Sequence, residues 1–452
     1  MNKITIIGIA LIFSVTGYSQ TILSLQESKN LAIKNNIAIK NSLLEINAAQ
    51  ETKKNAYTNY FPKVSATAFG MNAIDPLLKM ELKGGNLPVY DGNPANLPNA
   101  TQFAYFPDAS IGIFKKMGLG LVNVTQPVFA GGKIKTGNKL AAINIEVKEK
   151  QQKMIENEVL LKTEQQYWQL VTLQEKKKTL EKYEDLLTSI AKKVNDAFKA
   201  GLIIKNDVLK VQLKQSELQI NKNKLQNGKK LALMQFSQTI GIDFDSTLIL
   251  QDDLQVIENP YTFYVVSDSV LKNRTEYRLL EESVEAARLQ TEMKKGDYLP
   301  QVAVGLAGYY NNSFTKGVNA TTNGLAYATV SIPISNWWGG KHDIKEQKIK
   351  EQIIQNTFED SKDLLKLQME KAWTDVTEAY QQIMIMEQTI KQANENLKVN
   401  LDSYNSGIVT ISDLLEAQAL QTETADKLIE AKTNYKLAIT TYLQVTGRGN
   451  NN

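Results

Sequence analysis

The sequence predicts a mixed α and β protein built from two copies of one unit, each with a helix, a pair of strands and two long helices. Three observations support this prediction. Residues recur at a fixed offset, short segments alternate between apolar and polar residues as strands do, and long proline-free stretches carry apolar residues at helical spacing.

The first residues of the 452-residue chain have the pattern of a secretory signal peptide rather than of a buried helix. Lys3 is followed by an apolar run over 4–15 and by small residues that end at Ser19. The apolar run is too short to span a bilayer. We therefore expect a signal peptide over 1–19 and an exported mature chain that starts near Gln20.

The composition limits the classes of function. The chain has no cysteine, which excludes disulfides, thiol chemistry and a cysteine-linked lipid anchor. The formal net charge of +4 is too small to indicate nucleic-acid binding. No later stretch approaches the roughly 18 apolar residues of a transmembrane helix. An exported chain of this kind is either soluble or held in an outer membrane by β-strands.

The internal repeat is clearest at two glycine turns. Gly201 and Asp207 recur as Gly407 and Asp413, an offset of 206 positions because 407 − 201 = 206. The same offset pairs Pro127 with Pro333, Tyr167 with Trp373, Gln212 with Gln418, Leu231 with Leu437, and Gly241 with Gly447. We expect a first repeat over 20–241, an inter-repeat segment over 242–266, a second repeat over 267–447 and a disordered tail over 448–452.

Each repeat opens with a helix that ends at a proline break before a strand pair. We expect these helices over 25–58 and about 267–295, with the breaks at Pro62 and Pro300. Alternating segments predict the strands at 63–70, 118–128, 301–310 and 327–334. A double glycine after each pair, at 131–132 and 339–340, predicts a sharp change from strand to helix.

Two long helical stretches follow the strand pairs. The segment 133–200 has no proline, and its counterpart 341–406 has neither proline nor glycine. A helix over the first would extend about 100 Å at 1.5 Å per residue. Apolar residues recur at threes and fours, which is typical of coiled-coil packing. Return helices are expected after the glycine turns, to about 238 and 444.

The strand over 301–310 has two different faces. Val302, Val304, Leu306 and Tyr310 share one face, and the other holds small or polar residues. This pattern fits lipid outside and a lumen inside, although a strand over a protein core has it too. Four strands cannot close a membrane barrel, which needs about eight. Because open edges in lipid are costly, a membrane location would require strands from other subunits.

These residues resemble the TolC-like outer-membrane efflux family along essentially the whole mature chain. The resemblance is carried by the opening segment at 25–36, the break at 60–62, the Gln-Pro-Val-Phe-Ala-Gly-Gly segment at 126–132, and the Gly-x5-Asp-[Val/Leu]-Leu-x2-Gln turn at 201–212 and again at 407–418. Each motif alone is weak, but the ordered and doubled set is specific.

The resemblance implies a homotrimer in the outer membrane. Its β-barrel would have four strands per protomer, twelve in the trimer, and would be continued by a long periplasmic α-helical barrel with an equatorial layer near 241–264. It implies the exit duct of a tripartite efflux or type I secretion system that passes small molecules or polypeptides to the exterior. The implied partners are a periplasmic adaptor and an inner-membrane pump, with no enzyme activity and no cofactor.

Two alternatives remain at this stage. One is an exported coiled-coil stalk, structural or adhesive, that has no conduit. The other is a periplasmic adaptor or scaffold. A stalk does not need the strand pair that both repeats keep, and an adaptor or scaffold does not explain the lipid-facing alternation of the strands.

By position, the resemblance implies roles for two groups of residues. The resemblance assigns the periplasmic tip turns and the docking of the adaptor to Gly201, Leu202, Gly407 and Ile408. It assigns the periplasmic gate or constriction to Asp413, Glu416 and Asp207. Because Asp413 and Glu416 are one helical turn apart, they would form rings of carboxylates in a trimer. Helix capping by Asp207 and Asp413 is the alternative role.

One departure from the family lies beside these residues. The family's prototype has a gate-locking arginine two residues after the second glycine, where this chain has Val409. Lys205 in the first repeat is a candidate substitute.

Other candidates lie around the strands. Aromatic residues expected at the membrane interface are Trp337, Trp338, Tyr309 and Tyr310, with simple packing at the strand–helix junction as the alternative. The single histidine, His342, lacks partners for a zinc site or a hydrolytic triad, so it is expected to be solvated or at an interface. The insertion at 71–117 is expected to be an extracellular surface loop, or a partial cover of the outer opening.

Overall fold

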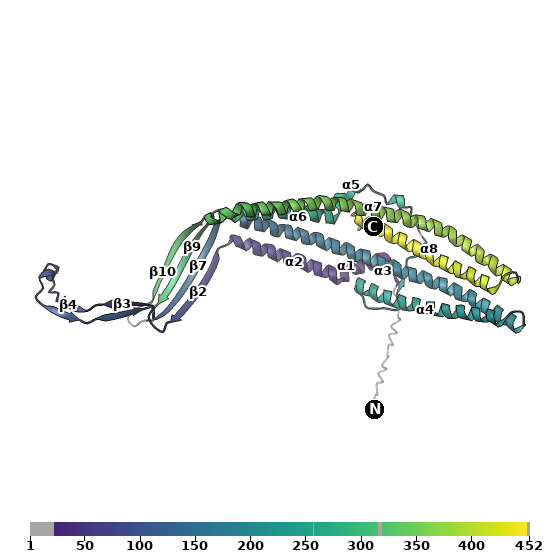
Figure 1. Ribbon diagram of the computed structural model, residues 1–452, viewed down its shortest axis with the longest axis horizontal. Helices are drawn as coiled ribbons and strands as arrows, with labels where there is room; N and C mark the ends of the chain where they lie inside the picture. The colour runs from purple at the N-terminus through teal and green to yellow at the C-terminus, as the bar shows by residue number, and fades with distance from the viewer. Residues whose placement is uncertain (1–21, 256, 315–318, 450–452) are drawn as a thin grey trace, which may run out of the picture. The chain divides into compact units, whose positions relative to one another are not determined.

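The computed structural model describes residues 22–449 apart from 256 and 315–318 (Figure 1). The predicted signal peptide and residues 450–452 of the predicted tail lie outside the described residues. The described chain divides into two compact units. Unit 1 comprises residues 22–49, 144–284 and 354–449, and unit 2 comprises 50–143 and 285–353.

Unit 1 consists mainly of long helices from both repeats. Its helices are α1 (Leu25–Asn35), α4 (Lys205–Ile240), α5 (Ser267–Val270) and α8 (Ile411–Val445). Four helices carry residues of both units: α2 (Ile37–Tyr57), α3 (Lys133–Lys199), α6 (Thr275–Gly296) and α7 (Trp337–Asn405). With 67 residues in α3 and 69 in α7, the two predicted long helices are confirmed.

The first predicted helix is divided at Asn36. Its backbone is extended there, so α1 ends and α2 begins. The Asn36 side chain donates to the Thr239 carbonyl at 2.8 Å and accepts from the Ala38 amide at 2.8 Å. Asn36 therefore stabilises the start of α2 while it holds α4, a tertiary role that helical periodicity does not show.

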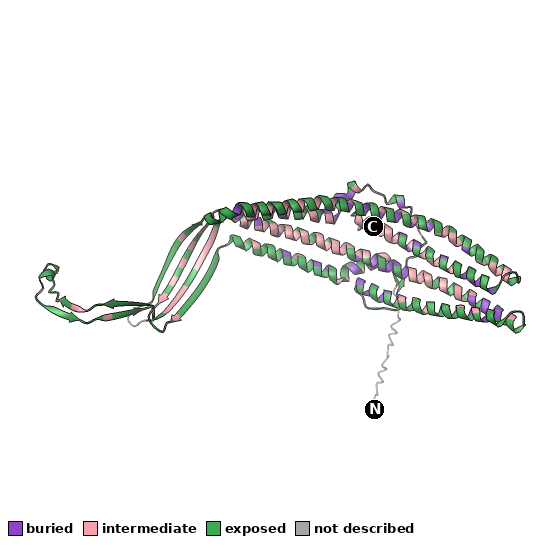
Figure 2. Ribbon diagram, in the orientation of Figure 1, coloured by how far each residue is buried: buried purple, intermediate pink, exposed green. Residues whose placement is uncertain are grey.

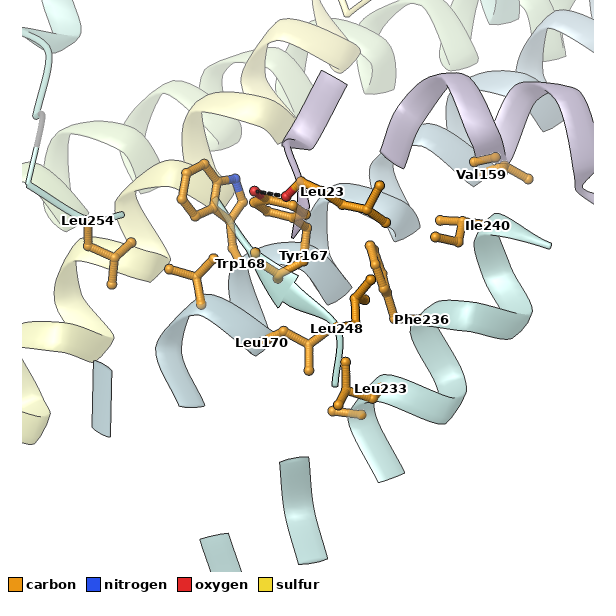
Figure 3. Close-up of a cluster of buried hydrophobic side chains, with 14 of the residues drawn as sticks. Leu23, Val159, Tyr167, Trp168, Leu170, Leu233, Phe236, Ile240, Leu248 and Leu254 are labelled. Atoms are coloured by element: carbon orange, nitrogen blue, oxygen red, sulfur yellow. Dashed lines mark hydrogen bonds between the residues drawn. The ribbon is translucent and has the colours of Figure 1, made fainter. Parts of the chain in front are cut away.

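A small core joins the first described residues to the inter-repeat segment (Figure 3). β1 (Ile22–Leu23) pairs in parallel with β8 (Ile249–Leu250). The Tyr167 hydroxyl donates to the Leu23 carbonyl at 3.1 Å and to the Asp252 carboxylate at 2.5 Å. Around them are the buried residues Trp168, Leu170, Val171, Leu233, Phe236, Ile240, Leu248, Leu250 and Leu254. The inter-repeat segment is therefore part of the unit 1 core.

The same segment contacts the C-terminal helix. The Tyr435 hydroxyl donates to the Glu258 carbonyl at 2.5 Å. Beyond α8, Arg448 donates to the Phe263 carbonyl at 2.7 Å and lies over the ring of Tyr442. Arg448, the first residue of the predicted tail, is thus bound to the inter-repeat segment.

Unit 2 contains a four-stranded antiparallel sheet in the order β10-β9-β7-β2 (Figure 1). The strands are β2 (Lys63–Asn72), β7 (Lys116–Ala130), β9 (Gln301–Asn312) and β10 (Thr321–Ser331). The central pair, β7 and β9, joins the two repeats. β10 starts six residues before the predicted strand and ends before Pro333, which cannot donate a ladder hydrogen bond.

The two glycine pairs have different roles, contrary to the prediction. Gly131 and Gly132 have φ of +64° and +77°, so they make the expected turn between β7 and α3. Gly340 lies instead within the first turns of α7, which begins at Trp337. A Cβ on Gly340 would lie 2.7 Å from the ring of Tyr298, so this glycine is needed for close packing.

The insertion in the first repeat is a β-ribbon and not a loop. Its strands are β3 (Leu78–Leu82), β4 (Gly85–Pro88), β5 (Phe103–Phe106) and β6 (Ala109–Ile113). β3 pairs with β6 and β4 with β5, both antiparallel. The prediction relied on the turn residues of the insertion and overlooked the alternation in 78–82, where apolar residues flank Lys79 and Glu81.

Burial differs between the units (Figure 2). Buried side chains gather along the helices of unit 1, whereas the strands of unit 2 are exposed or half-buried. Of the helices within the described residues, none is both long and apolar enough to cross a membrane.

Candidate functional site

The four-stranded sheet has one apolar face and one face that carries most of its polar residues. Residues that pair across neighbouring strands share a face. The apolar face is formed by Val64, Ala66, Ala68, Val122, Val124, Val302, Val304, Leu306, Ala326, Ala328 and Val330. The other face, the polar face, holds Lys63, Ser65, Thr67, Asn123, Thr125, Asn311, Asn323, Tyr327 and Thr329, together with the apolar residues Phe69, Leu119, Leu121 and Leu325. The two-faced pattern predicted from 301–310 therefore extends to neighbouring strands over 63–66 and 122–125, whereas Phe69, Leu119 and Leu121 depart from it.

A hydrogen-bonded group on the polar face links both repeats. The Tyr327 hydroxyl donates to Asn123 Oδ1 at 2.7 Å and lies 3.0 Å from Thr125 Oγ1. Its ring covers Gly305, where a Cβ would come too close to the Tyr327 ring atoms. A glycine inside β9 thus allows a large polar side chain to lie flat on the sheet.

The outer edges of this sheet are open. Within the part of the chain that the structure describes, β2 and β10 each pair with one strand only. The two strands have ten and eleven residues, so both edges are long. Unpaired N–H and C=O groups along such edges call for further strands.

The candidate interface aromatics differ in their surroundings. Trp338 is 80% exposed, while Trp337 donates its indole N–H to the Tyr298 carbonyl at 2.9 Å. Tyr310 shares the apolar face of the sheet, but Tyr309 points to the polar face because neighbouring residues alternate. The register therefore separates Tyr309 from the other candidates.

The two glycine turns have the same backbone geometry. Gly201 and Gly407 have φ of +77° and +72°, in the left-handed region that glycine tolerates. The following amides donate five residues back, from Leu202 to the Ala197 carbonyl and from Ile408 to Ser403, both at 2.9 Å. These are Schellman-type helix ends.

The side chains that follow the turn glycines point into solvent. Leu202 is 77% and Ile408 76% exposed. An apolar side chain so exposed at both turns is available to a partner protein.

Asp413 has the capping role that was one of its two predicted roles. The Thr410 side chain and backbone donate to its carboxylate at 2.7 and 2.8 Å, and the Asp413 amide donates to the Thr410 hydroxyl at 3.3 Å. This is a capping box at the start of α8. The hydrogen bonds from Thr410 lower the pKa of the Asp413 carboxyl. Asp413 is nevertheless exposed on the same side of α8 as Glu416, away from the buried Leu414 and Leu415.

Asp207 does not cap α4, contrary to the prediction. The N-cap position is held by Ile204, whose counterpart in the second repeat is Thr410, and an isoleucine has no hydroxyl to form a capping box. The Asp207 carboxylate instead lies 3.5 Å from the Lys210 ammonium.

Lys210 is a candidate that the sequence interpretation missed. Its ammonium donates to the Ser412 hydroxyl at 2.7 Å and so joins the second turn of α4 to the first turn of α8. Lys205, the predicted substitute for the family's arginine, is exposed. The signal in the sequence was Lys210 three residues after Asp207, the spacing of a helical ion pair.

A hydrophobic cluster lies beneath these polar contacts. It combines residues of α3, α4 and α8: Leu187, Ile190, Val194, Val208, Val211, Ile411, Leu414 and Leu415. Tyr404 packs against this cluster, and burial together with the nearby charge of Asp207 raises the pKa of its hydroxyl. The turn regions of both repeats are thus held together by apolar packing, with Lys210 at its polar margin.

The described residues contain no cluster of three or more acidic or histidine side chains arranged for a metal ion. His342 is exposed in the first turns of α7. Its neighbour Asp343 accepts hydrogen bonds from Tyr298 and Lys294. The arrangement around His342 thus belongs to the strand–helix junction.

Residues 266–448 match a protein-family model described as outer membrane efflux protein, which covers the predicted second repeat. No curated protein sequence matches the chain.

Several solved structures share the fold. The outer membrane protein VceC of Vibrio cholerae is 13% identical, with 94% of this chain and 96% of that chain covered and a TM-score of 0.70. The CmeC outer membrane channel of Campylobacter jejuni is 16% identical, with 94% and 86% covered and a TM-score of 0.72. The MtrE outer membrane channel of Neisseria gonorrhoeae is 12% identical, with 94% and 89% covered and a TM-score of 0.70.

Proposed function

We propose that the chain is a member of the TolC-like outer-membrane efflux family and forms the exit duct of a tripartite efflux or type I secretion system in the outer membrane. In this role it passes small molecules or polypeptides from the periplasm to the exterior. The family comprises transport channels rather than enzymes, so the energy for transport comes from a partner pump.

The open sheet of unit 2 is the observation that carries the proposal. Its apolar face suits lipid and its polar face suits a water-filled lumen. Its two unpaired edges exclude a stable single copy in lipid, where each unsatisfied backbone group costs several kcal/mol. Three copies of four strands give twelve strands, because 3 × 4 = 12, which is enough to close a barrel. A homotrimer therefore satisfies both edges.

The exposed turns supply the surface for a partner protein. Gly201, Leu202, Gly407 and Ile408 are assigned to the periplasmic tips, where a periplasmic adaptor docks. The left-handed glycines fix the turns, and the exposed Leu202 and Ile408 give apolar contact area. The adaptor connects the duct to an inner-membrane pump.

The acidic residues near the turns are assigned to the periplasmic constriction. Threefold symmetry turns Asp413, Glu416 and Asp207 into rings of three carboxylates. Such rings favour cations and repel anions. Trp337, Trp338 and Tyr310 are assigned to the membrane interface, where an aromatic ring with a polar group is stable.

Ion selectivity of the purified trimer in planar bilayers tests the constriction. We expect Glu416→Gln and Asp413→Asn to lower the preference for cations, because each removes three charges from the trimer. The matched control is Thr410→Ala, which removes the capping box and keeps the Asp413 charge. If Thr410→Ala lowers the cation preference as much as Asp413→Asn does, Asp413 acts only through the helix start. Unchanged selectivity in both acidic variants would remove the assigned constriction and keep the duct.

A further inference from the structure

The ribbon formed by β3 to β6 has an apolar face that the proposed duct does not explain. We call residues 73–115 the β-arm. It continues the sheet directly, because the Ala73 amide donates to the Lys115 carbonyl at 2.8 Å, just beyond the last β2–β7 pair. Figure 1 shows β3 and β4 leading away from the ends of β2 and β7.

The register gives the β-arm two unlike faces. Leu78, Met80 and Leu82 of β3 share a face with Ile111 and Ala109 of β6. The opposite face carries Lys79 and Glu81, with Ser110 and Gly112 across from them. The ribbon is therefore amphipathic in the way of a strand pair that is covered on one side.

The apolar face is uncovered in a single chain. Leu78 is 51%, Met80 49%, Ile111 48% and Leu82 43% exposed. A contiguous apolar patch of this kind on a protein marks an interaction surface.

Lipid does not account for this face. A strand of 9–11 residues crosses the apolar layer of an outer membrane, and β2 already has ten. The β-arm begins where that length has been used, so it projects beyond the hydrocarbon layer. Its apolar face there meets water unless another protein surface covers it.

We propose that the β-arms of neighbouring copies pack their apolar faces against one another around the threefold axis. This inference rests on the proposed trimer, because closure of β2 and β10 by other copies brings identical β-arms close together. Tethering of this kind raises the effective concentration of one β-arm near the next. The apolar face has no charged residue within β3 and β6, so identical faces can pack without repulsion. Lys79 and Glu81 then remain on the outside, in water.

Cysteine cross-linking tests the proposal cleanly because the native chain has no cysteine. Met80→Cys and Ile111→Cys place a thiol on the apolar face, while Glu81→Cys and Ser110→Cys place one on the opposite face of the same strands. All four positions are exposed, so the variants should fold. Each is purified as the full mature chain, treated with a short bismaleimide and run on a denaturing gel, with the oligomeric mass and bilayer conductance of the same sample measured beforehand.

We expect a covalent dimer band from Met80→Cys and Ile111→Cys, and loss of that band in Glu81→Cys and Ser110→Cys. A conducting trimer in which none of the four cross-links would overturn the β-arm proposal and leave the duct intact. In that trimer, ready labelling of Met80→Cys by a water-soluble maleimide would show that the apolar face is left open for another protein. Protection of Met80→Cys from the same reagent would show that lipid covers this face. Equal cross-linking on both faces would also overturn the proposal, since it indicates random collision. A sample that is monomeric and does not conduct would overturn the proposed function together with this inference.

Discussion

The contact between Lys210 and Ser412 should hold the turn regions of the two repeats together, and its removal has a predictable size. Lys210→Ala removes a charge-assisted hydrogen bond of 2.7 Å and the weaker approach to Asp207 at 3.5 Å. Because the Lys210 side chain is 37% exposed, solvent screens part of the interaction. We estimate a loss of about 1 kcal/mol per protomer. If the constriction opens by separating the turn regions of all three protomers together, the loss is about 3 kcal/mol. This loss shifts the equilibrium between the closed and the open constriction roughly a hundredfold toward the open state.

Single-channel recording in planar bilayers measures this effect as open probability. We expect Lys210→Ala to open far more often than the native trimer at the same voltage and salt. Lys205→Ala is the matched control, because it removes the same charge at an exposed position one to two turns earlier in α4. Equal behaviour of the two variants would refute the role of the Lys210 contact. A raised open probability in both would assign the effect to surface charge alone.

Three further predictions concern residues of unit 1, each measured by thermal or denaturant unfolding in detergent. Glu164→Ala should cost about 3 kcal/mol, because the nearly buried carboxylate joins Lys29 of α1 and Thr440 of α8, both at 2.6 Å; a cost below 1 kcal/mol would contradict this. Asp426→Asn should stabilise the protein at neutral pH, because burial disfavours the charged carboxylate and raises the pKa of Asp426. The contribution of the Asp426 carboxyl to stability is full below its unfolded pKa and is lost as the pH rises through its folded pKa. That gain should vanish on acidification, and a pH-independent effect would refute it. Gly407→Ala should cost about 1 kcal/mol from the positive φ alone, since no atom lies within 4 Å of the added Cβ; an unchanged midpoint would contradict that estimate.

The features that the sequence predicted correctly are those set by local physics. Helical spacing without proline identified α3 and α7, and a glycine followed by an aspartate six residues later located both turns. The alternation in 301–310 identified the two faces of β9, because neighbouring side chains of a strand point to opposite sides. The fixed offset then transferred each assignment from one repeat to the other.

The errors arose where a tertiary contact gave a familiar residue a different role. Gly340 has the spacing of a turn glycine, but it makes room for the ring of Tyr298 inside α7. Asn36 divides a helix because its side chain reaches α4. Repeat symmetry also led to a wrong prediction for Asp207. The N-cap of α4 is Ile204, where the second repeat has Thr410, so Asp207 makes no capping box and its carboxylate lies near Lys210 instead.

The contacts of the candidate site residues could not be predicted from the sequence. Asp413 and Glu416 were assigned by position from the family resemblance, and position does not show that the Thr410 hydroxyl donates a hydrogen bond to the Asp413 carboxylate. Lys210 is distant in sequence from Ser412, and only the packing of α4 beside α8 brings the pair together.

The most direct test of the duct is planar-bilayer conductance of the detergent-purified mature protein, with its oligomeric mass determined on the same sample. We predict a trimer that inserts into the bilayer and gives discrete, cation-preferring conductance steps, because only further copies can pair the open edges of β2 and β10. A monomer that neither inserts nor conducts would contradict the account and favour an exported helical stalk.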